Sequence, residues 1–438
     1  MESPEVRQRE ELMEARRLRR MEQAHRRKFQ QRLVLLILCV ILALSAVLIL
    51  RGCRSRQAQQ DAPAAAQADD FSQLGVETEP DIVFTLAAVG DITVDDEQLA
   101  AALQEDGSYD FTESFAAVSG LTSAADLTLG NLECTFAGQP YSGAPDFRTP
   151  ESLAATLQAV GFDVLQTANT YSIRSGLSGL QATHRVLTAA GVDHTGTYDS
   201  AAEREQSGGV LLKTVGGVKI AIVSATKGLD GLRLPEGSEY AVDVLYQDYD
   251  SDFEKLDTAS LLASVDAARA QKPDIILALL HWGSAGELAV TDRQRKLAQT
   301  LFENGVDAVI GSHSHLVGPM EQMTVTTNSG KEKTCFVAYS LGSFFAGRTG
   351  SYGSAGADSV LLNLQFTKNG QTGETSLTGV SYTPLYLADL GEEAKTRFEI
   401  LPVRSAIASG LFPELNDAMT NTISRLRTNT ASDFDSGR

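Results

Sequence analysis

The chain has 438 residues, of which 43% are hydrophobic and 21% charged, and its formal net charge is −19 at pH 7. Residues 57–438 hold 24 Lys and Arg against 50 Asp and Glu, and this excess of negative charge argues against nucleic acid as a partner. The same charge repels bulk polyanions, so an anionic substrate would need a local positive centre such as a bound metal ion.

The N-terminal segment predicts a membrane anchor. Residues 1–32 carry ten Lys and Arg with six Glu, which predicts a charged, helix-prone arm. Residues 33–50 contain no charged side chain and are rich in Leu, Ile and Val, which predicts a transmembrane helix near the lower length limit. A cleaved signal peptide is the alternative, but its basic region would be unusually long, and Leu50-Arg51 lacks a small-residue cleavage pattern. The positive-inside rule predicts a single-pass membrane protein with a cytoplasmic N-terminus and an extracellular C-terminal domain.

A flexible linker is predicted over residues 51–80, because most of this stretch is rich in Ala, Gln and Asp with scattered Pro. The globular domain is predicted over residues 81–405, and residues 406–438 form a polar tail that we expect to be disordered from Thr428 onward. Cys134 and Cys335 lie in the domain, and we expect two buried thiols rather than a disulfide on which the fold depends.

Short apolar runs alternate with amphipathic stretches along the domain, which predicts an α/β layered fold. Strands are predicted at 82–89, 126–129, 164–167, 218–225, 274–280, 307–310 and 335–340. Helices are predicted at 97–103, 152–160, 179–190, 261–270 and 292–304. The last helix has a good N-cap in Thr291 and a good C-terminal stop in Gly305.

Side chains that can bind metal follow the predicted strands. They are Asp91, Asn131, Glu133, Asn169, His281, His313 and His315. Each alone could equally be a turn residue, a helix cap, a surface carboxylate or a core histidine. Together they supply carboxylate, carboxamide and imidazole groups at one edge of a sheet, which predicts a hydrolytic site for one or two divalent ions such as Mn, Zn or Fe.

Two of these histidines, His313 and His315, are separated by one residue just after an apolar run. In an extended segment their side chains point the same way, so we expect both imidazoles to reach one small volume. The other two histidines of the domain, His184 and His194, have no comparable context and are interpreted as structural.

In these motifs the chain resembles the CapA-type poly-γ-glutamate capsule biosynthesis proteins, which look like relatives of calcineurin-type metallophosphoesterases. The motifs are Val89-Gly90-Asp91, Gly130-Asn131-Leu132-Glu133, His281-Trp282-Gly283 with Glu287, Gly311-Ser312-His313-Ser314-His315 and Tyr339-Ser340-Leu341-Gly342-Ser343-Phe344. The resemblance spans roughly residues 84–345. It implies a layered α/β/β/α sandwich of metallophosphoesterase type. It also implies a metal site formed by Asp91, Glu133, Asn169, His281, His313 and His315, with supporting roles for Asn131, Glu287, Tyr339 and Ser343.

The chain departs from the family pattern after the strand that ends at Ala168. The family usually has Asn-Asn-His there and an aspartate three residues later, whereas this chain has Asn169-Thr170-Tyr171 and then Arg174. Ser343 likewise replaces the usual asparagine of its motif. The missing histidine is the group that protonates the leaving oxygen or holds the phosphate in related enzymes, so the catalytic residues are not identified and we expect turnover to be slow or absent.

Three hypotheses for function follow. The first is a membrane-anchored extracellular protein that acts in the synthesis, transport or attachment of a capsule or cell-surface polymer such as poly-γ-glutamate, with the polymer or its membrane synthesis complex as partner. The second is an active metal-dependent phosphoesterase. The third is a non-catalytic module that binds the polymer or a partner protein. The chain contains no nucleotide-binding loop motif, so polymer synthesis would need other proteins.

Overall fold

The computed structural model describes residues 79–347 and 349–437. The predicted cytoplasmic arm, the predicted span at 33–50 and nearly all of the linker lie outside these residues. Among the helices of the described part of the chain, none combines the length and the apolar character needed to cross a bilayer.

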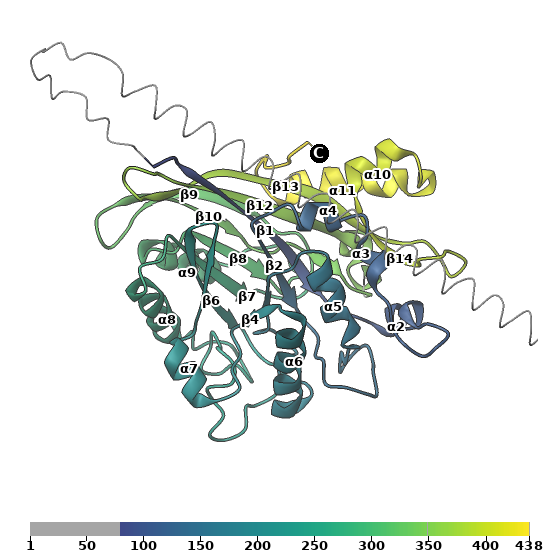
Figure 1. Ribbon diagram of the computed structural model, residues 1–438, viewed down its shortest axis with the longest axis horizontal. Coiled ribbons are helices and arrows are strands. Elements are labelled where there is room, and N and C mark those ends of the chain that lie inside the picture. The colour runs from purple at the N-terminus through teal and green to yellow at the C-terminus, as the bar shows by residue number, and fades with distance from the viewer. Residues whose placement is uncertain (1–78, 348, 438) are drawn as a thin grey trace, which may run out of the picture. The chain divides into compact units, whose positions relative to one another are not determined.

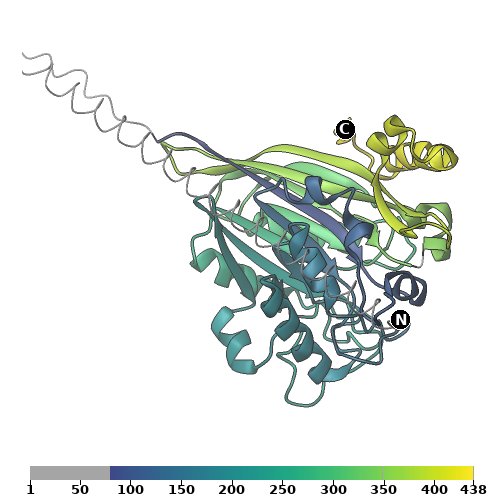
Figure 2. The same cartoon turned by 45° about the vertical axis from the view of Figure 1, so that its right-hand side comes forward.

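The larger of two β-sheets has β1 at its centre, hydrogen-bonded to β12 in antiparallel and to β2 in parallel orientation. Figure 2 shows β1, in purple, beside the long yellow-green strands of this sheet. In spatial order its strands are β14 (Phe398–Pro402), β13 (Thr375–Asp389), β12 (Asp358–Lys368), β1 (Ile82–Ile92), β2 (Leu127–Leu132), β3 (Val164–Gln166) and β4 (Asp193–Thr195), with β11 (Ser343–Phe345) paired to the end of β1.

The smaller sheet has a parallel centre formed by β6, β7, β8 and β10, with antiparallel strands at both edges. In spatial order its strands are β5 (Val210–Val215), β6 (Val218–Thr226), β7 (Ile275–His281), β8 (Ala308–Ser312), β10 (Glu332–Ala338) and β9 (Met320–Thr326).

The helices lie between and after these strands. They are α2 (Asp96–Ala102), α3 (Thr112–Phe115), α4 (Ser119–Thr122), α5 (Ser152–Ala159), α6 (Gly176–Ala190), α7 (Ala201–Ser207), α8 (Thr258–Ala270), α9 (Asp292–Glu303), α10 (Val403–Ser409) and α11 (Asn416–Asn429), with 3₁₀ segments η2 (Thr349–Ala357) and η3 (Pro413–Leu415). As predicted, α9 begins after a capping box formed by Thr291 and Gln294, and Gly305, at φ +99°, follows its C-cap.

Three apolar layers show how the sheets are stacked. Alternate residues of β1 serve two of them, because Leu86 and Ala88 face the smaller sheet whereas Ala87 and Val89 face helices α2, α3, α5 and α6. On the far side, α8 and α9 cover the outer face of the smaller sheet (Figure 1). The described domain is therefore a mixed α/β sandwich with helices outside two facing sheets, consistent with the predicted metallophosphoesterase type.

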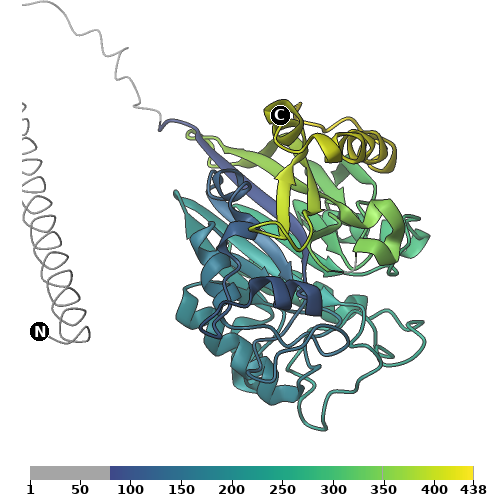
Figure 3. The ribbon, with the colours of Figure 1, turned by 90° about the vertical axis from the view of Figure 1, so that its right-hand side faces the viewer.

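The expectation of disorder after Thr428 is wrong for the described residues. Helix α11 continues to Asn429, and its buried face includes Met419 and Leu426. Beyond it, the backbone carbonyl of Phe434 accepts a hydrogen bond from Tyr382 in β13. The carboxylate of Asp435 is ion-paired with two arginines, one from α10 and one from α11. Figure 3 shows these C-terminal helices, in yellow, on the opposite side of the domain from the teal helices α6 and α7.

The two cysteines of the domain, Cys134 and Cys335, are free and buried, as expected. Burial raises the pKa of each thiol to about 12, so both are unreactive thiols at neutral pH.

Candidate metal centre

The predicted metal ligands meet where the carboxyl ends of strands from the two sheets face each other. Asp91 and Glu133 come from the ends of β1 and β2 in the larger sheet. His281 ends β7, and His313 and His315 follow β8 in the smaller sheet. The candidate site is thus built from both sheets.

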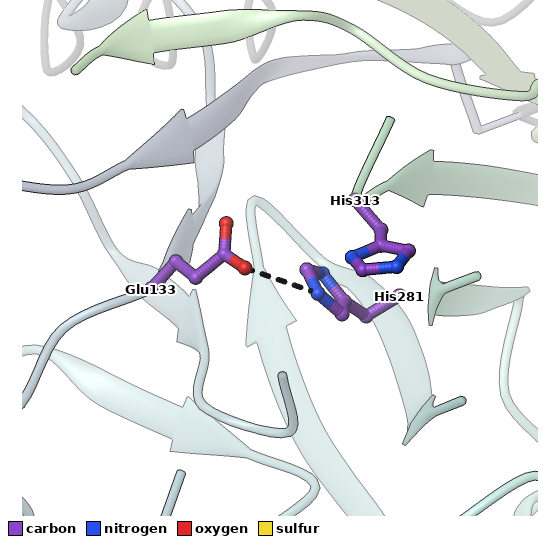
Figure 4. A group of neighbouring side chains, drawn as sticks. All are labelled: Glu133, His281 and His313. Atoms are coloured by element: carbon purple, nitrogen blue, oxygen red, sulfur yellow. Dashed lines mark ion pairs between the residues drawn. The ribbon is translucent and has the colours of Figure 1, made fainter. Parts of the chain in front are cut away.

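One group of possible ligands consists of Glu133, His281 and His313, with one ligand atom of each lying within 4.8 Å of the others. Glu133 Oε1 is 3.2 Å from His281 Nε2, and the centroids of the His281 and His313 rings are 4.6 Å apart. Figure 4 shows the Glu133 carboxylate pointing toward the His281 ring, beside which the His313 ring lies.

A second group consists of Asp91, Glu133 and His315, again with ligand atoms within 4.8 Å of one another. His315 Nδ1 lies 2.9 Å from Asp91 Oδ2 and 3.9 Å from Glu133 Oε2. Glu133 belongs to both groups and faces one histidine of each with a different oxygen. Glu133 would therefore be available to ions held by either group.

The buried carboxylates provide a test of whether a cation fits. Among the described residues, neither carboxylate oxygen of Glu133 receives a hydrogen bond, although both are buried. Burying carboxylates with so few donors is costly unless positive charge compensates them. Carboxylates and imidazoles together suit Mn, Fe or Zn, so the residues present fit a divalent ion.

The protonation states also suit metal binding. Burial alone would raise the pKa of Asp91, but hydrogen bonds from His315 and Asn131 and the charges of His315 and His281 bring it below its usual value. Burial lowers the pKa of His313 well below its ordinary value, and the nearby charges of His281, His315 and Lys227 lower it further. A charged carboxylate and a neutral imidazole are the forms that bind divalent ions.

Two polar side chains, those of Asn131 and Ser312, contact the possible ligands Asp91 and His281 and orient them. Asn131 Nδ2 donates to Asp91 Oδ1 at 2.8 Å and lies 3.3 Å from His281 Nδ1. Ser312 Oγ lies 2.9 Å from the same His281 nitrogen, which leaves His281 Nε2 facing Glu133. A supporting role was predicted for Asn131 but not for Ser312, whose only signal was its place between Gly311 and His313.

The segment after β3 contains Asn169, one of the predicted ligands, followed by Thr170 and Tyr171. Asn169 lies beside the site, but its Nδ2 donates to the Leu132 carbonyl at 2.6 Å and its Oδ1 accepts from the Tyr171 N–H at 3.1 Å. Thr170 instead enters the ligand cluster, with its hydroxyl oxygen 2.8 Å from His281 Nε2 and 3.4 Å from His313 Nδ1. The Tyr171 ring lies against the Phe147 ring, with centroids 4.5 Å apart.

The remaining predicted supporting residues are Ser343, Tyr339 and Glu287, and they differ in how closely they contact the ligand-bearing segments. Ser343 lies opposite Asp91 in the pairing of β11 with β1, and its hydroxyl donates to the His315 carbonyl at 3.4 Å. The Tyr339 carbonyl accepts a hydrogen bond from Trp282 Nε1 at 3.0 Å. Glu287 is exposed in the loop after β7 and belongs to neither ligand group found among the described residues.

Close backbone contacts hold the ligand-bearing segments in place. A Cβ on Gly90 would lie 1.8 Å from the carbonyl oxygen of Gly342, to which the Asp91 N–H donates at 3.0 Å. A Cβ on Gly311 would lie 2.1 Å from the Tyr339 carbonyl oxygen. Glycine is therefore required at both positions.

The expectation that His313 and His315 lie on an extended segment is wrong. Both have positive φ, +95° and +60°, which is uncommon for residues with a side chain. Their rings are 6.2 Å apart and serve different ligand groups. Such conformations typically cost about 1–3 kcal/mol each and persist where the surrounding structure requires them, which is frequent at functional sites.

The sequence of the domain matches a known protein family. The model for the bacterial capsule synthesis protein PGA_cap matches residues 85–348, more than half of the chain. The chain belongs to this capsule synthesis family. The matched range contains every predicted ligand.

Two proteins named for capsule or PGA biosynthesis and one uncharacterized protein are similar to parts of this chain. The PGA biosynthesis protein CapA of Bacillus subtilis (strain 168) is 25% identical over 315 residues, covering 70% of this chain and 73% of that protein. The capsule biosynthesis protein CapA of Bacillus anthracis is 21% identical over 197 residues, covering 44% of this chain and 42% of that protein. The uncharacterized protein y4uA of Sinorhizobium fredii is 34% identical over 150 residues, covering 32% of this chain and 30% of that protein.

Among solved structures, the likeness is more distant. A 5'-nucleotidase precursor from Thermus thermophilus is 15% identical with a TM-score of 0.40, over 70% of this chain and 54% of that chain. A phosphatase from Mycoplasma pneumoniae is 13% identical with the same TM-score, over 70% of this chain and 94% of that chain. At these scores neither likeness bears on the activity of the capsule synthesis protein.

Proposed function

We propose that this capsule synthesis protein is anchored in the cell membrane, presents its domain outside the cell and acts in the synthesis, transport or attachment of a cell-surface polymer such as poly-γ-glutamate. Family membership supports the link to capsule formation. The apolar segment at 33–50, with ten basic residues before it, supports the anchor and its orientation.

We further propose that the domain holds one or two divalent ions. The observation that carries this proposal is the buried Glu133 carboxylate, shared between two groups of ligands and without a hydrogen bond from the described residues. When bound there, such ions polarise a phosphate or acyl oxygen and lower the pKa of a bound water. Asn131 and Ser312 fix the orientation of His281, which keeps the ligand set in place without rearrangement.

Few histidines are available for proton transfer at this site, which argues for slow chemistry. The chain has six histidines, of which His25 lies outside the described residues. Three are the possible ligands, and His184 and His194 are stacked on each other with centroids 3.8 Å apart. No further imidazole of the described residues is left to act as a general acid, whose contribution is typically about two to four orders of magnitude.

Metal content and hydrolysis measured together test this proposal on the full-length protein purified in detergent. We expect bound Mn, Zn or Fe, slow hydrolysis of a model phosphodiester with added Mn, and loss of both in His313→Ala. A protein that contains metal but hydrolyses nothing would support the non-catalytic alternative, in which the domain binds the polymer or a partner. Absence of bound metal, with no thermal shift on adding Mn or Zn, would refute the metal site itself.

The location is tested separately. We expect the protein in the membrane fraction of intact cells, with residues 79–437 cleaved by protease added outside. Protection of the domain until the cells are lysed would refute the proposed orientation.

A further inference from the structure

A cavity of about 420 Å³ lies beside the candidate metal centre, on the side of the smaller sheet that carries α8 and α9. Its walls come from the ends of β6 and β7, from the long loop between β6 and α8, and from the start of α9. Such a volume is typical of small-molecule sites, and the walls combine apolar and aromatic side chains with polar and charged ones.

The cavity is connected to the metal centre through the backbone. The N–H of Lys227 donates to the carbonyl of His281 at 2.7 Å. Trp282 and Gly283, which directly follow His281, line the cavity. The Trp282 side chain is 3% exposed and stacks on Tyr339 with centroids 5.7 Å apart, so this wall is firmly held.

Two cations line the cavity without a carboxylate partner among the described residues. Lys227 Nζ donates to the Gly283 carbonyl at 2.7 Å and lies 4.6 Å from the centroid of the Phe253 ring. Arg293 Nη1 donates to the Phe253 carbonyl at 2.6 Å, and its guanidinium lies 5.7 Å from the centroid of the Tyr246 ring. Carbonyls and ring faces attract these cations but do not neutralise their charge.

Within an acidic domain, the two cations place a local positive charge at the cavity: Lys227 is partly buried and Arg293 is exposed. Several other partly buried cations are matched with carboxylates, as in Arg204–Asp243 at 2.7 Å and Lys213–Asp193 at 2.6 Å. In the cavity, the one acidic side chain among the lining residues is Asp252, which is exposed. A local positive centre is what an anionic substrate needs in order to approach a surface that otherwise repels it.

We propose that this cavity binds a carboxylate group carried on an apolar chain, as the part of the substrate adjacent to the group that reaches the metal centre. Lys227 and Arg293 hold the carboxylate, and the stem of the chain lies against Trp282, Tyr246 and Phe253. A bare phosphate would satisfy the two cations but would leave the aromatic walls uncovered. This inference rests on the proposed function in one respect: it assumes that the substrate reacts at the metal centre.

The chain offers a direct probe of this cavity, because Trp282 is its only tryptophan. We would titrate the full-length protein with a tetramer of γ-linked glutamate and follow the tryptophan fluorescence. We expect a saturable change that weakens with salt, and an affinity reduced roughly tenfold or more in Lys227→Met and in Arg293→Met, because each loses a charge-assisted contact. A tetramer of γ-linked isoglutamine, in which every carboxylate is replaced by a carboxamide and the amino terminus is acetylated, should give no saturable change.

A matched control is Lys296→Met. Lys296 lies on α9, the helix that carries Arg293, but does not line the cavity. Equal affinity in Lys227→Met, Arg293→Met and Lys296→Met would overturn the proposal, as would equal binding of the neutral tetramer. Full competition by inorganic phosphate at the same concentration would overturn the choice of a carboxylate on an apolar chain. Unchanged midpoints of thermal unfolding would show that the variants are folded. Because Arg293 is exposed, Arg293→Met tests the cavity even if Lys227→Met is unstable.

The titration is repeated after removal of metal with EDTA, to separate this inference from the proposed function. Binding that survives EDTA and is weakened by Lys227→Met supports the cavity even for a protein that hydrolyses nothing. Normal metal content and hydrolysis, together with no charge-dependent binding of the tetramer, would refute the cavity alone.

Discussion

The replacement Glu133→Gln should have opposite effects on the metal-free and the metal-loaded protein. In the metal-free protein, the ligand oxygens of Glu133 and Asp91 lie no more than 4.8 Å apart. At that separation and an effective dielectric constant of about 20, two unit charges repel each other by about 3 kcal/mol. Part of this is offset by the contacts of both carboxylates with His281 and His315. We therefore expect the metal-free variant to be more stable by about 1–2 kcal/mol.

The metal-loaded protein should respond in the other direction. An ion present at 100 times its dissociation constant stabilises the folded state by about 2.7 kcal/mol. A carboxamide at position 133 removes the charge shared by both ligand groups, so most of that stabilisation should disappear.

Thermal unfolding of parent and variant, each with EDTA and with added Mn, measures both effects. For a domain of this size roughly 2 °C corresponds to each kcal/mol. The exposed Glu287→Gln serves as the matched control, because it removes the same charge outside the ligand groups. A metal-free variant less stable than the parent, or one that keeps the full Mn-dependent shift, would refute the reasoning.

Three further changes give distinct outcomes. Gly311→Ala should lower the free energy of unfolding by roughly 3 kcal/mol and reduce metal content, since its Cβ would lie 2.1 Å from a backbone oxygen. Burial lowers the pKa of His184 and of His194 to about 4. Their neutral forms are thus favoured in the folded state, and the stability that they contribute should be full above about pH 6.5 and fall as the pH drops toward 4, as urea unfolding can measure. The double variant Thr170→Asn, Tyr171→His should increase phosphodiester hydrolysis by about two orders of magnitude, measured with Mn.

Each of these has its own control. Gly318→Ala, in the loop after His315, meets no atom closer than 3.4 Å and should leave stability unchanged. His194→Phe should flatten the acid dependence, and an unaltered pH profile would contradict the assignment to the stacked pair. An unchanged rate in the double variant, with metal content intact, would show that the residues after Asn169 do not limit turnover.

The sequence predicted the framework of the site because its ligands follow continuous apolar runs. Strands β1, β2, β7 and β8 are buried on both faces, so their sequences stand out, and the ligands lie at their ends. Strands β12 and β13 were not predicted, because they follow the last recognised motif, and β13 is interrupted by Ser, Thr, Gly379 and Pro384.

The details of the site depended on loop backbone that no periodicity encodes. The left-handed conformations of His313 and His315 place them in different ligand groups, which their spacing in the sequence did not determine. The turn after β3 directs the amide of Asn169 to backbone groups and brings the Thr170 hydroxyl to the histidines. Lys227 gave no signal in the sequence, because its role depends on the cavity formed by a distant loop and helix.

The division of the ligands between two sheets has a consequence for the order of assembly. Neither sheet alone supplies a complete ligand group, since Asp91 and Glu133 come from one and the three histidines from the other. The candidate ion-binding pocket therefore exists only after both sheets have formed and docked through their shared apolar layer. If, as proposed, the domain holds ions outside the membrane and crosses the membrane unfolded, it would acquire them on the far side, and the metals available there, not those of the cytoplasm, would decide which ion it carries.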